Sequence, residues 1–197
     1  AYCFVSSCFN NSMVFPITKA YTQAMRLFYA LTFDEQTLSR LSDIQDSLVP
    51  LLEKGRKSAK HNLHLTLSFL GNQEPRLLPL FKEIVAALPN TSINLQFSHL
   101  GRFTKSGGDV IWLGIQRNVE LLHLQSMLVE HLIKSRVPIS DTSFAAHITL
   151  FRNARIAELP SFSPFSCTSQ AIRLMLSHQV ENVLVYTPLA SNFLLEN

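Results

Sequence analysis

Two short segments of the chain carry the same chemistry-bearing pattern, a histidine followed two positions later by a threonine. His64 and Thr66 stand in the run NLHLTLSFLG, and His147 and Thr149 stand in the run HITLFR. Both runs favour strands, in which successive side chains alternate between the two faces of a sheet. Each histidine should therefore share one face with its threonine, while the intervening leucine and isoleucine residues point into the core.

Two such pairs facing one cleft would supply a proton acceptor, a proton donor and two hydroxyl groups. Because imidazole titrates near ~6.5, one neutral ring can take a proton from water while a charged ring gives one to a leaving oxygen. The hydroxyls can hold phosphate oxygens without adding charge. This set suits a displacement at phosphorus that uses no metal ion.

A structural interpretation stands beside the functional one, because a single His-x-Thr in a strand usually marks a half-buried histidine. Two copies with apolar flanks shift the balance towards function. Neither copy has the HxH or HExxH spacing that gathers metal ligands, so no metal site is predicted. The remaining histidines show no grouping and are interpreted as structural or surface residues: His61, His99, His123, His131 and His178.

Within the first run, strict alternation places Ser68 beside His64 and Thr66, and it sends Phe69 to the core face with the leucines. The same rule aims Arg152, which follows the second motif, away from His147 unless the strand bends. Arg152 is a candidate for binding phosphate or stacking on a base. Phe28, on a strand expected to border the cleft, is a candidate for stacking a nucleobase, with a core position as the alternative.

Composition limits the classes of protein to which the chain can belong. It has 197 residues, 47% of them hydrophobic, which is enough for one globular domain. The 17 basic and 14 acidic residues give a net charge of +3, which permits a phosphate-bearing partner without requiring one. Three cysteines without CxxC spacing argue against a disulfide framework and favour the cytoplasm. No apolar run is long enough for a membrane span.

Strand-like and helix-like segments alternate from Met25 onwards. Strands are expected at 26–32, 61–70, 92–101, 109–115, 143–152, 171–180 and 183–189, and helices at 35–55, 74–88 and 118–136. Pro50 should kink or end the first helix. Residues 53–61 are expected to form a loop whose basic side chains either guide RNA or are simply solvated. The mixture predicts an α+β fold of two similar lobes in residues 25–197. Residues 1–24 lack a clear period and are interpreted as an extension of upstream or non-native origin.

Several segments together resemble the two-histidine (2H) phosphoesterases, and among them the RNA 2′,3′-cyclic phosphodiesterases called LigT or ThpR. They are RLFYAL at 26–31, NLHLTLSFLG at 62–71, VIWLGI at 110–115, HITLFR at 147–152 and YTPL at 186–189. The resemblance covers the chain from about Met25 onwards and is specific, since paired His-x-Thr motifs define the superfamily.

The resemblance implies a bilobal α+β fold with a pseudo-twofold axis, and hydrolysis of RNA 2′,3′-cyclic phosphate ends to 2′-phosphates without a cofactor or metal. It also implies joining of tRNA halves through a 2′-5′ bond as a reverse-type activity. His64 would protonate the departing 3′ oxygen and His147 would activate water, while Thr66 and Thr149 would bind the phosphate. The expected partners are RNA ends or tRNA fragments that carry a 2′,3′-cyclic phosphate. The protein is expected to be a monomer that does not associate with a membrane.

Two alternatives remain open from the sequence. One is a phosphodiesterase for small cyclic nucleotides, which the same residues could serve. The other is a non-catalytic module that binds RNA ends, against which the intact histidines and threonines of both motifs argue.

Overall fold

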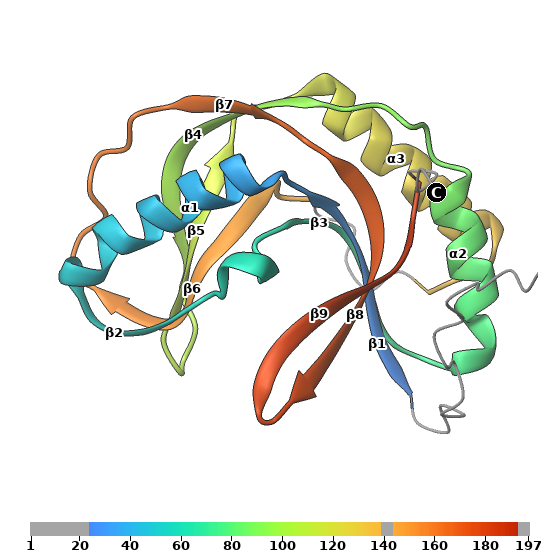
Figure 1. The fold of residues 1–197 in the computed structure, drawn as a ribbon, viewed down its shortest axis with the longest axis horizontal. Helices are drawn as coiled ribbons and strands as arrows, with labels where there is room; N and C mark the ends of the chain where they lie inside the picture. Colours follow the sequence, from blue (N-terminus) through green and yellow to red (C-terminus); the bar gives the residue numbers. More distant parts are fainter. Residues whose placement is uncertain (1–23, 139–143, 193–197) are drawn as a thin grey trace, which may run out of the picture.

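A curved antiparallel sheet, with helices packed against both of its halves, builds the structure (Figure 1). The computed structural model describes residues 24–138 and 144–192. Its strands are β1 (Met25–Thr32), β2 (Leu52–Lys57), β3 (Leu65–Gln73), β4 (Asn94–Phe103), β5 (Asp109–Ile115), β6 (His147–Ile156), β7 (Phe165–Thr168), β8 (Ala171–Val180) and β9 (Val183–Ser191). The α-helices are α1 (Glu35–Leu48), α2 (Leu78–Ala86) and α3 (Val119–Lys134), and short 3₁₀ turns cover Val49–Leu51, Lys60–Asn62 and Pro75–Leu77.

The sheet has two halves that meet along a narrow seam. Its strand order is β7-β4-β5-β6-β3-β1-β8-β9, with β2 paired to the outer part of β6. The two halves meet where β3 pairs with β6, and the register recorded there is the single pair Leu65 and Ile148. In Figure 1, α1 lies over β4, β5 and β6, whereas α2 packs near β8 and β9 and α3 packs near β3. This arrangement is the α+β, two-lobed fold that the sequence predicts.

Helix ends follow local sequence signals. Asp34 caps α1 by accepting a hydrogen bond of 2.8 Å from the backbone N–H of Thr37, and Asn118 caps α3 in the same way through Leu121. Pro50 lies in the 3₁₀ turn after α1 and prevents the helix from continuing. Buried leucines on one side of α3 then face the core: Leu121, Leu124, Leu128 and Leu132.

Two strands differ from the sequence-based expectation. The segment Leu52–Lys57 was expected to end the first helix and begin a loop. It forms strand β2 instead, because after Pro50 the chain turns back and pairs with β6. Lys54 and Arg56 in β2 face Arg155 and Arg152 across the pair. The short strand β7 was not predicted either. Four residues paired with β4 leave too little alternation for a pattern to be recognised.

The expected extension at residues 1–24 lies, apart from residue 24, outside the described residues. Met25 opens β1 as expected and is buried. Among the residues that the structure describes, no helix has both the length and the apolar character needed to cross a membrane.

Candidate active site

His64 lies just before β3 and makes two hydrogen bonds through its ring. Its Nδ1 lies 2.7 Å from the carbonyl oxygen of Asn62, and its Nε2 lies 3.1 Å from the hydroxyl of Thr66. A carbonyl oxygen can only accept, so Nδ1 carries the proton. In the neutral ring, Nε2 therefore accepts from Thr66, which keeps the basic nitrogen beside the hydroxyl.

His147 opens β6 and is held in the same manner. Its Nδ1 donates to the carbonyl oxygen of Ala145 over 2.7 Å, again to the residue two positions earlier. Nε2 is left to act as the basic or acidic nitrogen. Two separate segments thus fix the same tautomer through the same backbone contact, which leaves Nε2 of each ring available for proton exchange.

The surroundings of each histidine disfavour its charged form. Burial is the main cause that lowers the pKa of His64 to about 4, and the charges of Arg152 and His147 lower it further, against a raising effect from the hydrogen bond to Asn62. Burial is also the main cause that lowers the pKa of His147, and Arg152 again adds to the effect. The positive charge of Arg152 thus disfavours the charged form of both rings.

Aromatic rings flank each histidine. The His64 ring lies with its centroid 4.9 Å from that of Phe28 and 5.1 Å from that of Tyr186. The corresponding neighbours of His147 are Phe103 at 5.1 Å and Trp112 at 5.8 Å. These rings provide the apolar walls that desolvate the imidazoles.

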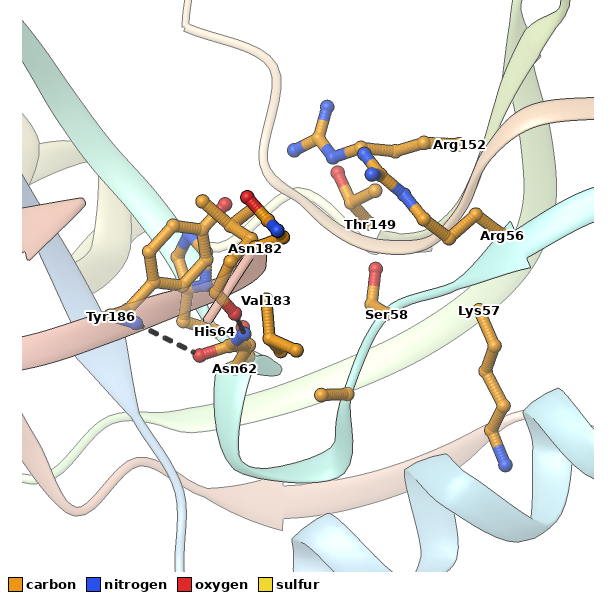
Figure 2. A pocket seen from close by; sticks show the side chains of 12 residues that line it. Arg56, Lys57, Ser58, Asn62, His64, Thr149, Arg152, Asn182, Val183 and Tyr186 are labelled. Atoms are coloured by element: carbon orange, nitrogen blue, oxygen red, sulfur yellow. Dashed lines mark hydrogen bonds between the residues drawn. The ribbon is translucent and has the colours of Figure 1, made fainter. Parts of the chain in front are cut away.

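A pocket between the two halves of the sheet brings part of the predicted site together. His64, Thr149 and Arg152 line it, along with Arg56, Asn62 and Tyr186, and Figure 2 shows these side chains around one space. Thr66 joins the site through its hydrogen bond to His64. His147 is not among the described residues that line this pocket, and it stands two residues before Thr149 on β6.

Arg152 enters the pocket because β6 is irregular. Trp112 of β5 pairs with Thr149, but the next residue, Ile111, pairs with Phe151, so Leu150 is an extra residue on β6. Such a bulge changes the alternation of side chains. Leu150 and Phe151 are consequently both buried, and Arg152 comes to line the pocket with Thr149. Strict alternation would have directed Arg152 away from the pocket, and this bulge is the bend that brings it there.

An equivalent irregularity in β3 corrects the expectation for Ser68 and Phe69. Ala30 pairs with Thr66 and Tyr29 with Ser68, which leaves Leu67 as an extra residue. Ser68 is therefore buried at 9% exposure instead of sharing the face of His64. Phe69 is 42% exposed, and its ring contacts Phe28 with the centroids 5.5 Å apart.

Phe28 takes the core position that was the alternative to stacking a nucleobase. Its side chain is 1% exposed and packs between the rings of His64, Phe69 and Tyr186. A ring without an open face cannot stack on a nucleobase. The contacts of Phe28 in this structure are those of a support for His64.

Two buried polar residues outside the motifs link neighbouring elements to the segments that carry the site. Asn62 donates to the carbonyl oxygen of Leu184 over 2.8 Å and accepts from the N–H of Tyr186 over 3.1 Å, which ties the β9 strand to the segment carrying His64. Gln45 of α1 is 0% exposed and donates to the carbonyl oxygens of Ser58 and Leu150. The position of Asn62 two residues before His64 was a usable signal, whereas Gln45 resembles any polar helix residue.

Two of the positive residues before the first motif have acidic partners of their own. Lys57 forms an ion pair with Asp46 of α1 at 2.6 Å, and Lys60 forms one with Glu35. Within residues 24–138 and 144–192, no three His, Cys, Asp or Glu side chains lie close enough together to hold a metal ion.

Comparison with known proteins gives consistent results. Residues 34–178 match the 2′-5′ RNA ligase superfamily. An RNA 2′,3′-cyclic phosphodiesterase of Archaeoglobus fulgidus is 30% identical over 133 residues, which are 66% of this chain and 74% of the relative. The protein of the same name from Thermus thermophilus is 32% identical over 149 residues, covering 71% of this chain and 73% of that protein.

Solved structures agree with this result. The crystal structure of E. coli LigT complexed with 3′-AMP superposes with a TM-score of 0.72 at 27% identity, covering 86% of this chain and 97% of that one. TT0787 of Thermus thermophilus superposes with a TM-score of 0.68 at 26% identity, covering 85% and 96%. The match over residues 34–178 and the shared fold confirm the resemblance drawn from the two motifs, and the chain belongs to the 2′-5′ RNA ligase superfamily.

Proposed function

We propose that the protein hydrolyses RNA 2′,3′-cyclic phosphate ends to 2′-phosphate ends. The observation that carries the proposal is the matched restraint of the two histidines, whose Nδ1 atoms donate to carbonyl oxygens and whose Nε2 atoms are left for proton exchange. The relatives named RNA 2′,3′-cyclic phosphodiesterases support this choice of substrate.

In the proposed reaction, His147 acts as the base and His64 as the acid. Nε2 of His147 takes a proton from water, the water oxygen forms a bond to phosphorus, and the bond from phosphorus to the 3′ oxygen breaks. Nε2 of His64 gives its proton to that oxygen, leaving a 3′ hydroxyl and a 2′-phosphate. Thr66 and Thr149 hold the phosphate oxygens, and Arg152 offsets their negative charge.

The lowered pKa of His64 requires that the substrate help to charge the acid. In the free protein, burial and then the Arg152 and His147 charges favour its neutral form. A bound cyclic phosphate places a negative charge beside the same ring and counteracts Arg152. Binding of substrate should therefore raise the pKa of His64, so that the acid is protonated in the complex in which it acts.

The same acid and base can serve the reverse-type reaction by microscopic reversibility, joining RNA ends, such as tRNA halves, through a 2′-5′ bond. We place both activities in a cytoplasmic monomer. No step assigned to the side chains involves a metal ion, so hydrolysis should proceed in EDTA.

The test is incubation of the protein with an oligonucleotide that ends in a 2′,3′-cyclic phosphate, in buffer containing EDTA. Opening of the cyclic phosphate at an undiminished rate supports the proposal. Binding of the oligonucleotide without hydrolysis would show a module that only binds RNA ends. Hydrolysis that stops in EDTA and returns with added metal would exclude the two-histidine mechanism.

A further inference from the structure

Arg56 and Arg152 face each other across two hydrogen-bonded strands. Arg56 of β2 is the register partner of Arg152 of β6, and both line the pocket that contains His64. Figure 2 shows both guanidinium groups extending into the space beside Thr149. Neighbouring strands lie only about 5 Å apart, so two positive groups are brought close together.

Neither arginine has an acidic partner among the described residues, although several neighbours do. Lys57 is paired with Asp46, Lys60 with Glu35 and Arg155 with Glu53. Like charges directly opposite each other destabilise a pair of strands. The part of the chain described by the structure therefore holds two uncompensated guanidinium groups at the pocket, an arrangement that suits a ligand with more than one negative charge.

The two arginines differ in depth. Arg152 is half-buried and stands three residues after Thr149, whereas Arg56 is exposed and belongs to the strand beyond β6. After burial, the charge of Arg152 is among the causes that lower the pKa of both histidines. Arg152 is thus placed to meet the reacting phosphate, while Arg56 stands nearer the mouth of the pocket.

We propose that Arg56 binds the phosphate on the 5′ side of the terminal nucleotide, and so makes the site prefer RNA ends to nucleosides with a cyclic phosphate alone. The inference rests on the proposed function and adds to it a residue that determines specificity. A planar guanidinium can bind a phosphate through two parallel hydrogen bonds, which an amine cannot reproduce. A substrate without a 5′-phosphate offers Arg56 nothing to bind.

The experiment compares two substrates that differ only in this group, adenosine 2′,3′-cyclic phosphate and its 5′-phosphorylated form. The wild-type protein should show a higher kcat/KM for the 5′-phosphorylated substrate. Arg56→Gln should reduce that preference roughly tenfold, the effect of losing one charge-assisted contact. Arg56→Lys, which keeps the charge but loses the fork, should retain only part of the preference.

Lys57→Gln is the matched control. It removes one positive charge from the neighbouring position of β2. Lys57 also borders the pocket, but its amine points away from the two guanidinium groups (Figure 2) and is engaged with Asp46 of α1. This variant should keep the wild-type preference. Circular dichroism of each variant reports whether the fold is retained.

Any of three results would overturn the inference. The wild-type protein has the same kcat/KM for both substrates, or Arg56→Gln lowers kcat/KM equally for both. The third is a Lys57→Gln variant whose preference falls as much as that of Arg56→Gln. Equilibrium binding of the two nucleotides to His64→Ala measures the preference without turnover. The proposed function fails if the wild-type protein hydrolyses neither these nucleotides nor an oligonucleotide that ends in a 2′,3′-cyclic phosphate, and the binding measurement still decides the role of Arg56.

Discussion

At the scale of single residues, the site depends on which nitrogen of each imidazole carries a proton. Both Nδ1 atoms are committed to backbone carbonyl oxygens, of Asn62 and of Ala145. The backbone thereby orients each ring, and neither ring requires a carboxylate to set its tautomer. Aromatic rings wall both histidines, and His64 differs in the additional hydrogen bond between its Nε2 and Thr66.

Removing either imidazole should remove one proton transfer. We expect His64→Ala and His147→Ala each to lower kcat by at least about 10²-fold, the lower range for a positioned acid or base, while the circular dichroism spectrum stays unchanged. His123→Ala, at an exposed position of α3, is the control and should keep wild-type activity. Substantial turnover by either active-site variant would contradict the assignment.

The lowered pKa values predict an acidic optimum for the free protein. His147 must be neutral to accept a proton, so kcat/KM should rise as pH rises through a pKa below 6.5. His64 must be charged to donate, so kcat/KM should fall as pH rises beyond its pKa of about 4. The resulting bell reports two apparent values that belong to the coupled pair.

Because the bound phosphate favours the charged form of His64, the alkaline limb of kcat should lie at higher pH than that of kcat/KM. Steady-state rates measured across the pH range check this shift. An alkaline limb at the same pH for both parameters would show that substrate does not raise the pKa of the acid.

At the scale of secondary-structure elements, two bulged strands decide which side chains reach the pocket. Leu150 in β6 and Leu67 in β3 are the extra residues, and Arg152 and Phe69 follow each motif histidine at the same interval of five positions. Alternation of apolar residues predicted the faces of His64, Thr66, His147 and Thr149. It failed beyond the bulges, because a bulge is set by pairing with the neighbouring strand and has no pattern of its own in the sequence.

Gln45 should be a stability residue as well as a connection between α1 and the site. Replacing it with alanine removes the donor to the carbonyl oxygen of Ser58, at about 1–3 kcal/mol for a buried group left unpaired, whereas the carbonyl oxygen of Leu150 keeps its hydrogen bond from the N–H of Ser58. Urea unfolding should show this loss, and Gln36→Ala, on the exposed side of α1, should change the free energy of unfolding by less than about 0.5 kcal/mol. Equal effects of the two substitutions would show that the Gln45 hydrogen bonds contribute nothing specific.

Gly101 should matter because it leaves room for the ring that walls His147. A Cβ atom at this position would lie 2.2 Å from Cη2 of Trp112. Gly101→Ala should therefore displace Trp112 and lower activity, whereas Gly107→Ala, whose Cβ would meet nothing within 4 Å, should have little effect on it. Trp112 fluorescence and kcat/KM measured on the same samples check the two parts of the prediction, and an unshifted spectrum in Gly101→Ala would contradict it.

At the scale of the whole molecule, the two halves of the sheet make similar but unequal contributions. Each supplies a histidine, a threonine and aromatic walls, and they meet at the pair Leu65 and Ile148. One half adds Arg152 where the other has Phe69, which gives the site a charged side and an apolar side. This inequality provides a physical basis for giving the two histidines different roles.

The sequence predicted this division because each half carries its own copy of the motif in its own strand. It did not predict β2 as a strand, and with it the pairing of Arg56 with Arg152, because six mostly exposed residues have no buried face to reveal a period. The role of Gln45 could not be predicted from the sequence either, because its partners are backbone carbonyl oxygens of other segments, at Ser58 and Leu150.

The identity of the product distinguishes the roles proposed for His64 and His147. An RNA oligonucleotide ending in a 2′,3′-cyclic phosphate is incubated with the protein in EDTA, and phosphorus NMR distinguishes the two monoesters that can form. If His64 protonates the 3′ oxygen, the product is the 2′-phosphate, formed without metal. A 3′-phosphate as the main product would contradict the roles given to the two histidines, and absence of hydrolysis unless metal is added would contradict the mechanism itself.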